Sequence, residues 1–259
     1  RWKEQVFPAL DQFNSIHEHL VAKWADIRPL LPSNEIHFTH VFDDAGEDTV
    51  TTAYLRDTAA AGGIGSSVIL IEDIGLSADG RFVDLDEQVI TTLFKLYPWE
   101  WLVNEEYADA VFQNVDTMVW LEPIWKMMWS NKGILPLLWE RFPGHPNLLA
   151  SQFEDASTVN SPVPTGWVRK RLFSREGANI DLGLMDGERV SSDGDYNDSP
   201  TILQSVAPLT KFTDENGVGG YALIGSWVVG DMPAGMGVRK DETLITKDTA
   251  RFVPHFIED

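Results

Sequence analysis

A short basic segment is the sequence's best candidate for chemistry. It runs from Lys170 to Asn179, with Lys170 on an expected strand and Arg175 and Gly177 in a turn rich in serine and glycine. A hairpin loop with free backbone N–H groups and two cations can cover a triphosphate. The other interpretation is a surface hairpin with an incidental lysine and arginine, and the segment alone favours that interpretation.

Two further cations change this balance. Lys132 lies at the start of an expected helix in a Trp-rich setting, and Arg239 lies in a glycine-rich hairpin. The 259-residue chain has 20 Lys+Arg and 40 Asp+Glu, which gives a net charge of −20. In so acidic a chain, cations at structured positions need a partner. A phosphate anion is one candidate, and carboxylates of the same chain are the other.

The composition excludes several classes of protein. Cysteine is absent, so disulfides, cysteine zinc sites and cysteine nucleophiles are excluded. The strong negative charge repels phosphate backbones, so we expect no nucleic-acid partner; it would attract a polycation, although acidic soluble proteins are common. The sequence contains no apolar run near the roughly 18 residues of a membrane-spanning helix, so we expect no membrane partner.

The sequence offers only weak metal-binding patterns. Asp193, Asp195 and Asn197 have the spacing of the first ligands in a calcium loop, but Asp198 and Gln204 occupy the positions that need glycine and glutamate. The six histidines form no zinc signature. We therefore predict no metal ligand within this chain.

The elements that must position these side chains change character along the sequence. In the first half, apolar residues at three- and four-residue steps predict one amphipathic helix over about 6–27. Beyond it, strands and helices alternate. Strands are expected at 36–42, 68–71 and 117–121, and helices at 48–61 and from 98. The segment 91–97 fits either a strand or a helix. This alternation predicts a mostly parallel α/β unit over residues 33–122.

The second half reads differently. Residues 123–129 are expected to be helical, and Asn131 to cap a helix that ends near 142. After Gly166, short strand-like runs are separated by turn residues, at 168–173, 179–185, 201–206, 221–229, 237–239 and 243–246. We therefore expect an antiparallel, β-rich half after the parallel one.

Five separated segments resemble one known family. They lie at 93–100, 130–140, 173–179, 225–239 and 244–246. In this order they look like the glutathionylspermidine synthase-like ATP-grasp family, in its stand-alone bacterial branch without an amidase domain. The resemblance implies an α/β, ATP-grasp fold with a preceding parallel pre-ATP-grasp unit. It also implies an N-terminal helix over 1–32, a substrate-side unit over 33–122, an ATP-grasp unit over 123–259, and a cytoplasmic location.

The resemblance implies a reaction as well. Members of this family are ATP-dependent carboxylate–amine ligases that use ATP and Mg²⁺ and pass through an acyl phosphate. The carboxylate would belong to a glutathione-like peptide and the amine would be spermidine-like. The alternative is a catalytically inactive nucleotide-binding or scaffold module of the same fold.

Residue by residue, the resemblance assigns Arg175 as catalytic, because it matches the loop arginine that stabilises the transferring phosphoryl group. The ATP-binding residues that it implies are Lys132, Lys170, Ser174, Gly177, Gln204, Ser205, Val206 and Arg239. The family's Mg²⁺ ligands, an Asp and a Glu-x-Asn set, lie upstream of Arg1 and have no counterpart here. Either they precede this segment or the chain lacks metal chemistry.

Overall fold

The computed structural model describes residues 2–155, 157–213 and 217–258. The chain forms two compact units. The parallel unit comprises Asn14–Met127 and Trp227–Gly235, and the antiparallel unit comprises Arg1–Phe13, Met128–Ser226 and Met236–Asp259. The division into 1–32, 33–122 and 123–259 stays a prediction. Within the described residues, no helix is both long and apolar enough to cross a membrane.

The parallel unit is built on one four-stranded sheet. Its strands lie in the order β2 (Gly65–Leu70), β1 (Glu35–His40), β5 (Thr92–Leu96) and β6 (Val119–Leu121), and each neighbouring pair is parallel. The ambiguous segment 91–97 is therefore a strand, in the centre of the sheet. Two short strands, β3 (Gly75–Leu76) and β4 (Phe82–Val83), form a separate antiparallel pair.

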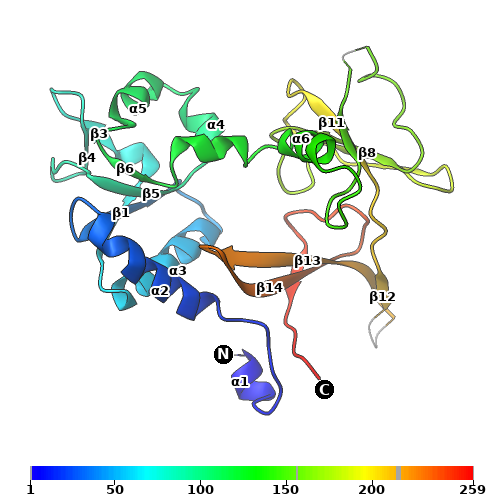
Figure 1. Ribbon diagram of the computed structural model, residues 1–259, viewed down its shortest axis with the longest axis horizontal. Helices are drawn as coiled ribbons and strands as arrows, with labels where there is room; N and C mark the ends of the chain where they lie inside the picture. The colour runs from blue at the N-terminus through cyan, green and yellow to red at the C-terminus, as the bar shows by residue number, and fades with distance from the viewer. Residues whose placement is uncertain (1, 156, 214–216, 259) are drawn as a thin grey trace. The chain divides into compact units, whose positions relative to one another are not determined.

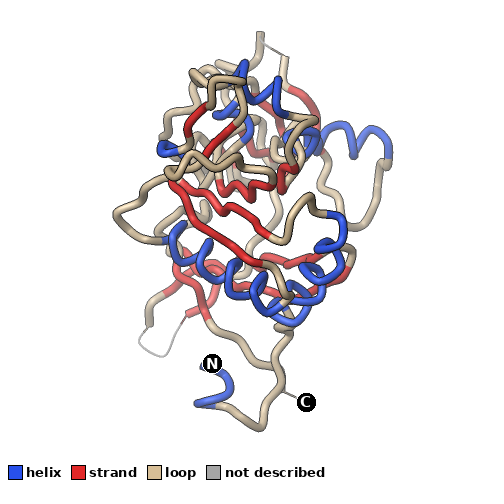
Figure 2. Tube along the Cα trace, turned by 90° about the vertical axis from the view of Figure 1, so that its left-hand side faces the viewer, coloured by secondary structure: helices blue, strands red, loops and turns tan. Residues whose placement is uncertain are grey.

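Helices cover both faces of this sheet (Figure 1). On one face, α2 (Ile16–Ile27) and α3 (Glu47–Ala61) pack together, and Trp24 packs its ring at 5.8 Å from the ring of Phe38. Figure 2 shows these helices on one side of the strands. On the other face, α4 (Trp99–Leu102) and α5 (Ala108–Asn114) contribute to a second apolar cluster. Short 3₁₀ turns complete the unit, at Arg28–Leu30, Ile71–Asp73 and Ile124–Met128.

The single helix predicted over about 6–27 is wrong. The chain forms α1 (Trp2–Val6) and α2, and the residues between them are not helical. Pro8 explains the break, because proline disfavours the helical conformation of the residue before it and lacks an N–H of its own. The apolar side chains are used differently: the Phe7 ring packs at 4.8 Å from the ring of Phe256.

The antiparallel unit contains the hairpins expected after Gly166. Its first sheet has the strand order β10 (Arg189–Ser191), β9 (Ile180–Gly183), β8 (Trp167–Arg171), β11 (Thr201–Ser205) and β7 (Ser151–Phe153). All four pairings are antiparallel. The helix α6 (Ile134–Arg141) packs against β7. The predicted order, a parallel α/β part followed by antiparallel sheets, is therefore confirmed.

A second sheet has the order β12 (Lys211–Thr213), β13 (Gly219–Val229), β14 (Met232–Asp241) and β15 (Arg251–Val253). The strand expected over 243–246 is wrong, because the chain bends after β14. Asp241 causes the bend: its carboxylate accepts hydrogen bonds from the backbone N–H groups of Thr243 at 2.8 Å and Lys247 at 3.0 Å. A chain folded around one carboxylate in this way does not extend as a strand.

Candidate functional site

Three side chains form a polar line across neighbouring strands of the first antiparallel sheet. Gln204 on β11 lies directly opposite Ser151 on β7, and Lys170 on β8 lies opposite Ile202, two residues before Gln204. Residues two apart on a strand share a face, so all three side chains lie on one face. The Lys170 Nζ donates to Gln204 Oε1 at 2.8 Å, and Gln204 Nε2 donates to Ser151 Oγ at 3.1 Å.

Lys170 is held as a partly buried cation with a neutral partner. Burial lowers the pKa of its ammonium from the ordinary lysine value. Gln204 and Ser151 are both buried. The amide oxygen of Gln204 satisfies one N–H of the ammonium but supplies no negative charge. The arrangement therefore suits an anion that approaches Lys170.

The preceding residue, Arg169, points to the other face and is paired with carboxylates, since its Nη1 also lies 3.8 Å from Asp181 Oδ2. Its guanidinium donates to both carboxylate oxygens of Glu154, at 2.6 and 2.5 Å, and to the carbonyl oxygens of Thr158 and Ser161. Burial alone would raise the pKa of Glu154. The hydrogen bonds from Arg169 and Thr201 and the charge of Arg169 together outweigh burial, so the pKa lies below its ordinary value. Two adjacent basic residues thus differ: Arg169 has a carboxylate, and Lys170 has an amide.

Lys132 lies next to the end of β8. Its backbone N–H donates to the carbonyl oxygen of Leu172 at 3.0 Å. Its Nζ donates to the carbonyl oxygen of Ser174 and lies 3.3 Å from Ser174 Oγ. Ser174 is buried, and its hydroxyl donates to the Arg171 carbonyl oxygen at 3.2 Å. The structure therefore brings Lys132 and Ser174 together at the start of the basic loop.

The loop from Ser174 to Asn179 requires glycine at one position. Gly177 has a φ of +76°, and a Cβ there would lie 2.7 Å from the carbonyl oxygen of Thr246. Only glycine fits this close approach without a shift of the backbone. Arg175, two residues earlier, is exposed at the turn.

The remaining predicted residues are engaged within the protein. The backbone N–H of Ser205 donates to the Ala150 carbonyl oxygen at 2.8 Å, and that of Val206 donates to Gly166 at 2.9 Å. On β14, Arg239 donates to the Lys247 carbonyl oxygen at 2.6 Å. Direct contacts thus join Lys132 with Ser174 and Lys170 with Gln204, whereas the contacts of Arg239 lead to the segment after β14.

A pocket of about 640 Å³ lies in the parallel unit, outside the carboxyl ends of its strands. Ligands commonly bind at this edge of a parallel sheet. Glutamate, aromatic and aliphatic side chains line it: Val41, Ile71, Glu72, Ile74, Phe82, Leu93, Tyr97, Leu102, Glu105, Glu106, Tyr107 and Trp120.

Hydrogen bonds order two of the three acidic side chains of this pocket, Glu72 and Glu105. The Tyr97 hydroxyl donates to Glu105 Oε1, and Glu72 Oε1 accepts from the backbone N–H of Phe42 at 3.1 Å. Burial and the neighbouring Glu105 raise the pKa of Tyr97 far above its ordinary value, so its hydroxyl stays a donor. Carboxylates beside aromatic rings suit a cationic ligand.

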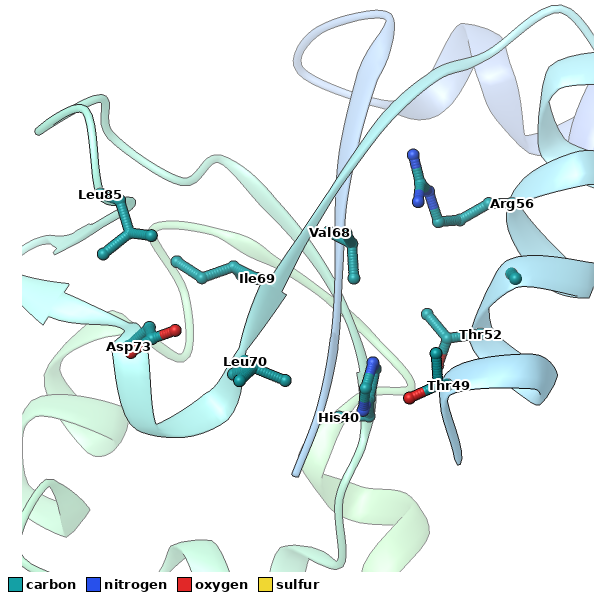
Figure 3. A pocket seen from close by; sticks show the side chains of 10 residues that line it. His40, Thr49, Thr52, Arg56, Val68, Ile69, Leu70, Asp73 and Leu85 are labelled. Atoms are coloured by element: carbon teal, nitrogen blue, oxygen red, sulfur yellow. The ribbon is translucent and has the colours of Figure 1, made fainter. Parts of the chain in front are cut away.

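A smaller pocket of about 350 Å³ lies between β2 and α3 (Figure 3). Its polar side chains mostly bind the protein itself. Arg56 donates to Ser66 Oγ at 3.3 Å, Thr49 Oγ1 donates to Asp43 at 3.1 Å, and His40 Nδ1 lies 2.7 Å from the Val41 carbonyl oxygen. We therefore assign this pocket no part in the function.

Sequence reasoning missed Ser151 and the pocket residues Glu72, Tyr97 and Glu105. Ser151 lies on a three-residue strand in a region punctuated by prolines, so its pairing with Gln204 depends on a register that no local pattern reveals. The pocket had a weak signal, since Glu105 follows closely after the aromatic segment that begins at Tyr97.

The described residues contain no large cluster of the usual metal-ligating side chains. Within residues 2–155, 157–213 and 217–258, no group of three or more His, Asp or Glu side chains could hold an ion. The weak calcium spacing at Asp193 to Asn197 belongs instead to a loop in which Asn179 Nδ2 donates to Asn197 Oδ1 at 3.0 Å.

Comparison with known proteins places this geometry in context. A protein of Haemophilus influenzae assigned as an acid–amine ligase is 36% identical over 99% of this chain and 65% of its own length. Trypanothione synthetase of Crithidia fasciculata is 26% identical over 95% of this chain and 40% of its own. The bifunctional glutathionylspermidine synthetase/amidase of Escherichia coli is 26% identical over 98% of this chain and 43% of its own.

The chain thus spans 40–65% of the length of these relatives. The family model described as glutathionylspermidine synthase preATP-grasp matches residues 1–258, which is nearly the whole chain. The mixed α/β fold with its parallel sheet agrees with the pre-ATP-grasp expectation. This chain belongs to the glutathionylspermidine synthase pre-ATP-grasp family.

Proposed function

We propose that this chain carries the nucleotide-binding and substrate-binding parts of an ATP-dependent carboxylate–amine ligase. The carboxylate would come from a glutathione-like peptide, and the amine would be spermidine-like. The observation that carries the proposal is the partly buried Lys170, whose partner is the neutral amide of Gln204. In a chain with a net charge of −20, such a cation is best explained by an anionic ligand.

On the nucleotide side, we assign the ATP phosphates to Lys132 and Lys170. The two residues are joined through β8: Lys170 lies on that strand, and Lys132 binds Leu172 and Ser174 just beyond it. Gly177 keeps the following loop close to residue 246. Gln204, Ser205 and Val206 would lie toward the nucleotide base, and Arg239 would be a second phosphate-side cation.

The chemistry follows from these assignments. A carboxylate oxygen of the peptide attacks the γ-phosphorus of ATP, and ADP leaves. The amine nitrogen then attacks the acyl phosphate carbon, inorganic phosphate leaves, and the nitrogen loses a proton. Phosphoryl transfer depends on positioning and charge neutralisation, which cations supply. We assign the neutralisation of the transferring group to the exposed Arg175.

On the amine side, we assign the acidic pocket of the parallel unit. A spermidine-like amine carries several positive charges separated by methylene groups. The carboxylates of Glu72, Glu105 and Glu106 would bind the ammonium groups, and the rings of Tyr97 and Tyr107 would contact the methylenes. The reacting nitrogen must be neutral when it attacks, so these carboxylates would hold the charged nitrogens instead.

We assign no residue of this chain to Mg²⁺, because the described residues contain no group of three or more His, Asp or Glu side chains that could hold an ion. We also place the reaction in the cytoplasm, as the family resemblance implies.

Turnover by the full-length protein tests the proposal. Peptides and polyamines are screened for amine-dependent ADP release in the presence of Mg²⁺. Arg175→Ala should reduce turnover by about 100-fold with a much smaller change in ATP affinity, as for the loss of one electrostatic donor in a transition state. ATP binding without any amine-dependent ADP release would favour the inactive module. Turnover unchanged by Arg175→Ala would refute the role of this arginine.

A further inference from the structure

The hydroxyl of Ser151 has one proton, and it donates this proton to a backbone carbonyl oxygen rather than to Gln204. Its Oγ donates to the carbonyl oxygen of Leu149 at 2.9 Å. A hydroxyl has one donor and two acceptor lone pairs, so what Ser151 offers to Gln204 is an acceptor. Gln204 must therefore turn its NH₂ group toward Ser151, and the observed Nε2–Oγ distance of 3.1 Å fits this orientation.

The orientation of Gln204 has a consequence for Lys170. With its NH₂ toward Ser151, the amide presents its oxygen to Lys170 Nζ, 2.8 Å away. The opposite orientation would point the NH₂ group of Gln204 at the Lys170 ammonium. Both groups are donors, so no hydrogen bond could form between them. Ser151 and Gln204 are 5% and 6% exposed, so little water can replace a lost hydrogen bond.

We infer that Ser151 is a positioning residue, which fixes the Gln204 amide so that its oxygen holds the Lys170 ammonium for an incoming anion. The inference rests on the proposed function in one respect only, namely that the anion is the phosphate chain of ATP. The line from Leu149 through Ser151 and Gln204 to Lys170 crosses three adjacent strands, so the pairing of β7, β11 and β8 sets it.

The test compares Ser151→Ala with Ser151→Thr. Alanine removes the acceptor and frees the amide to rotate, whereas threonine keeps the hydroxyl. We expect ATP affinity to fall about fivefold in Ser151→Ala, the scale of one hydrogen bond, and to be retained in Ser151→Thr. The matched control is Thr201→Ala, which removes a buried hydroxyl of the same sheet that binds Glu154 instead. It should leave ATP affinity unchanged.

A second readout needs no nucleotide. The Lys170 ammonium loses its oriented acceptor in Ser151→Ala, so more of it should be neutral at a given alkaline pH. Its rate of acylation, read by peptide mass spectrometry against Lys132 as internal reference, should rise several-fold. In a Gln204→Leu background, Ser151→Ala should add nothing further, because its effect passes through the amide.

The outcomes separate the two proposals. Lys170 reactivity that changes as expected in a protein that does not bind ATP would support the positioning role and refute the nucleotide assignment. ATP binding with equal Lys170 reactivity in the wild type and Ser151→Ala would overturn the positioning role. An equal loss of ATP affinity in Thr201→Ala would show that Ser151 acts only through the stability of the sheet.

Discussion

The two charged regions of this molecule are built in opposite ways. In the antiparallel unit, the Lys170 cation is held in the interior of a sheet by a neutral residue on the neighbouring strand. In the parallel unit, Glu72 and Glu105 lie beyond the ends of strands, in a pocket of about 640 Å³. Strand register fixes the first region, and loops after strands form the second. The comparison teaches that a site for an anionic ligand and a site for a cationic ligand can be built in different ways within one chain.

The largest effect should come from the buried ion pair beside Lys170. The side chains of Arg169 and Glu154 are 8% and 1% exposed. Glu154→Gln would leave the buried guanidinium with only the half-exposed Asp181, 3.8 Å away, as a charge partner, so the free energy of unfolding should fall by about 3 kcal/mol. Because the folded pKa of Glu154 is lowered, its share of stability is present at neutral pH and is lost as the pH falls through that value. Urea unfolding measures both effects.

The matched control is an exposed ion pair of the parallel unit. Arg81 Nε lies 2.8 Å from Asp79 Oδ2, and the two side chains are 54% and 60% exposed. Asp79→Asn should cause no resolvable change in the urea midpoint, since exposed pairs contribute little. Equal losses in the two variants would contradict the claim that burial makes the first pair important.

The next effect tests the contrast between Arg169, which is paired with a carboxylate, and Lys170, which is proposed to bind an anion. Lys170→Met should weaken ATP binding by about 10- to 100-fold, the scale of a hydrogen bond to a charged group. Titration calorimetry measures this change. The same variant should bind spermidine with unchanged affinity, because the acidic pocket belongs to the other unit. A parallel loss of both affinities would mean general damage to the fold.

The pH dependence of ATP binding should report the burial of Lys170. Burial lowers the pKa of this lysine, so its charge is lost at a lower pH than that of an exposed lysine. ATP affinity should therefore fall as the pH rises through the lowered value, while Lys170→Arg keeps its charge and removes this decline. Affinity that holds up to the ordinary lysine pKa in the wild type would argue that phosphate does not contact Lys170.

The smallest effect is expected in the acidic pocket. Glu105→Gln removes one of three carboxylates that line it, and the Tyr97 hydroxyl can still donate to the amide oxygen. Spermidine affinity should fall about three- to tenfold, with little change in ATP affinity. Glu35→Gln, at an exposed glutamate at the opposite end of β1, serves as the charge-matched control. Equal losses in both would indicate only a long-range effect of net charge.

Sequence patterns predicted the elements better than the contacts between them. The helix at 48–61 and the hairpin around Asp186-Gly187 follow from local signals, and both are present. The long N-terminal helix failed because Pro8 outweighs apolar periodicity. Ser151 could not be predicted, since its role arises from a strand register between residues 53 positions apart. Local signals singled out Lys170 as a candidate, and its role stays a prediction; the orientation of the Gln204 amide beside it depends on a neighbouring strand.

The central claim is that the anionic ligand, ATP, binds in the antiparallel unit and the cationic ligand, a polyamine, binds in the parallel unit. Hydrogen exchange of the same protein, with ATP or with spermidine, tests it most directly. ATP should slow exchange in peptides that contain β8 and the loop to Asn179, and spermidine should slow exchange in peptides that cover Tyr97 to Tyr107. ATP protection confined to residues outside the antiparallel unit, or spermidine protection absent from Tyr97–Tyr107, would contradict the account.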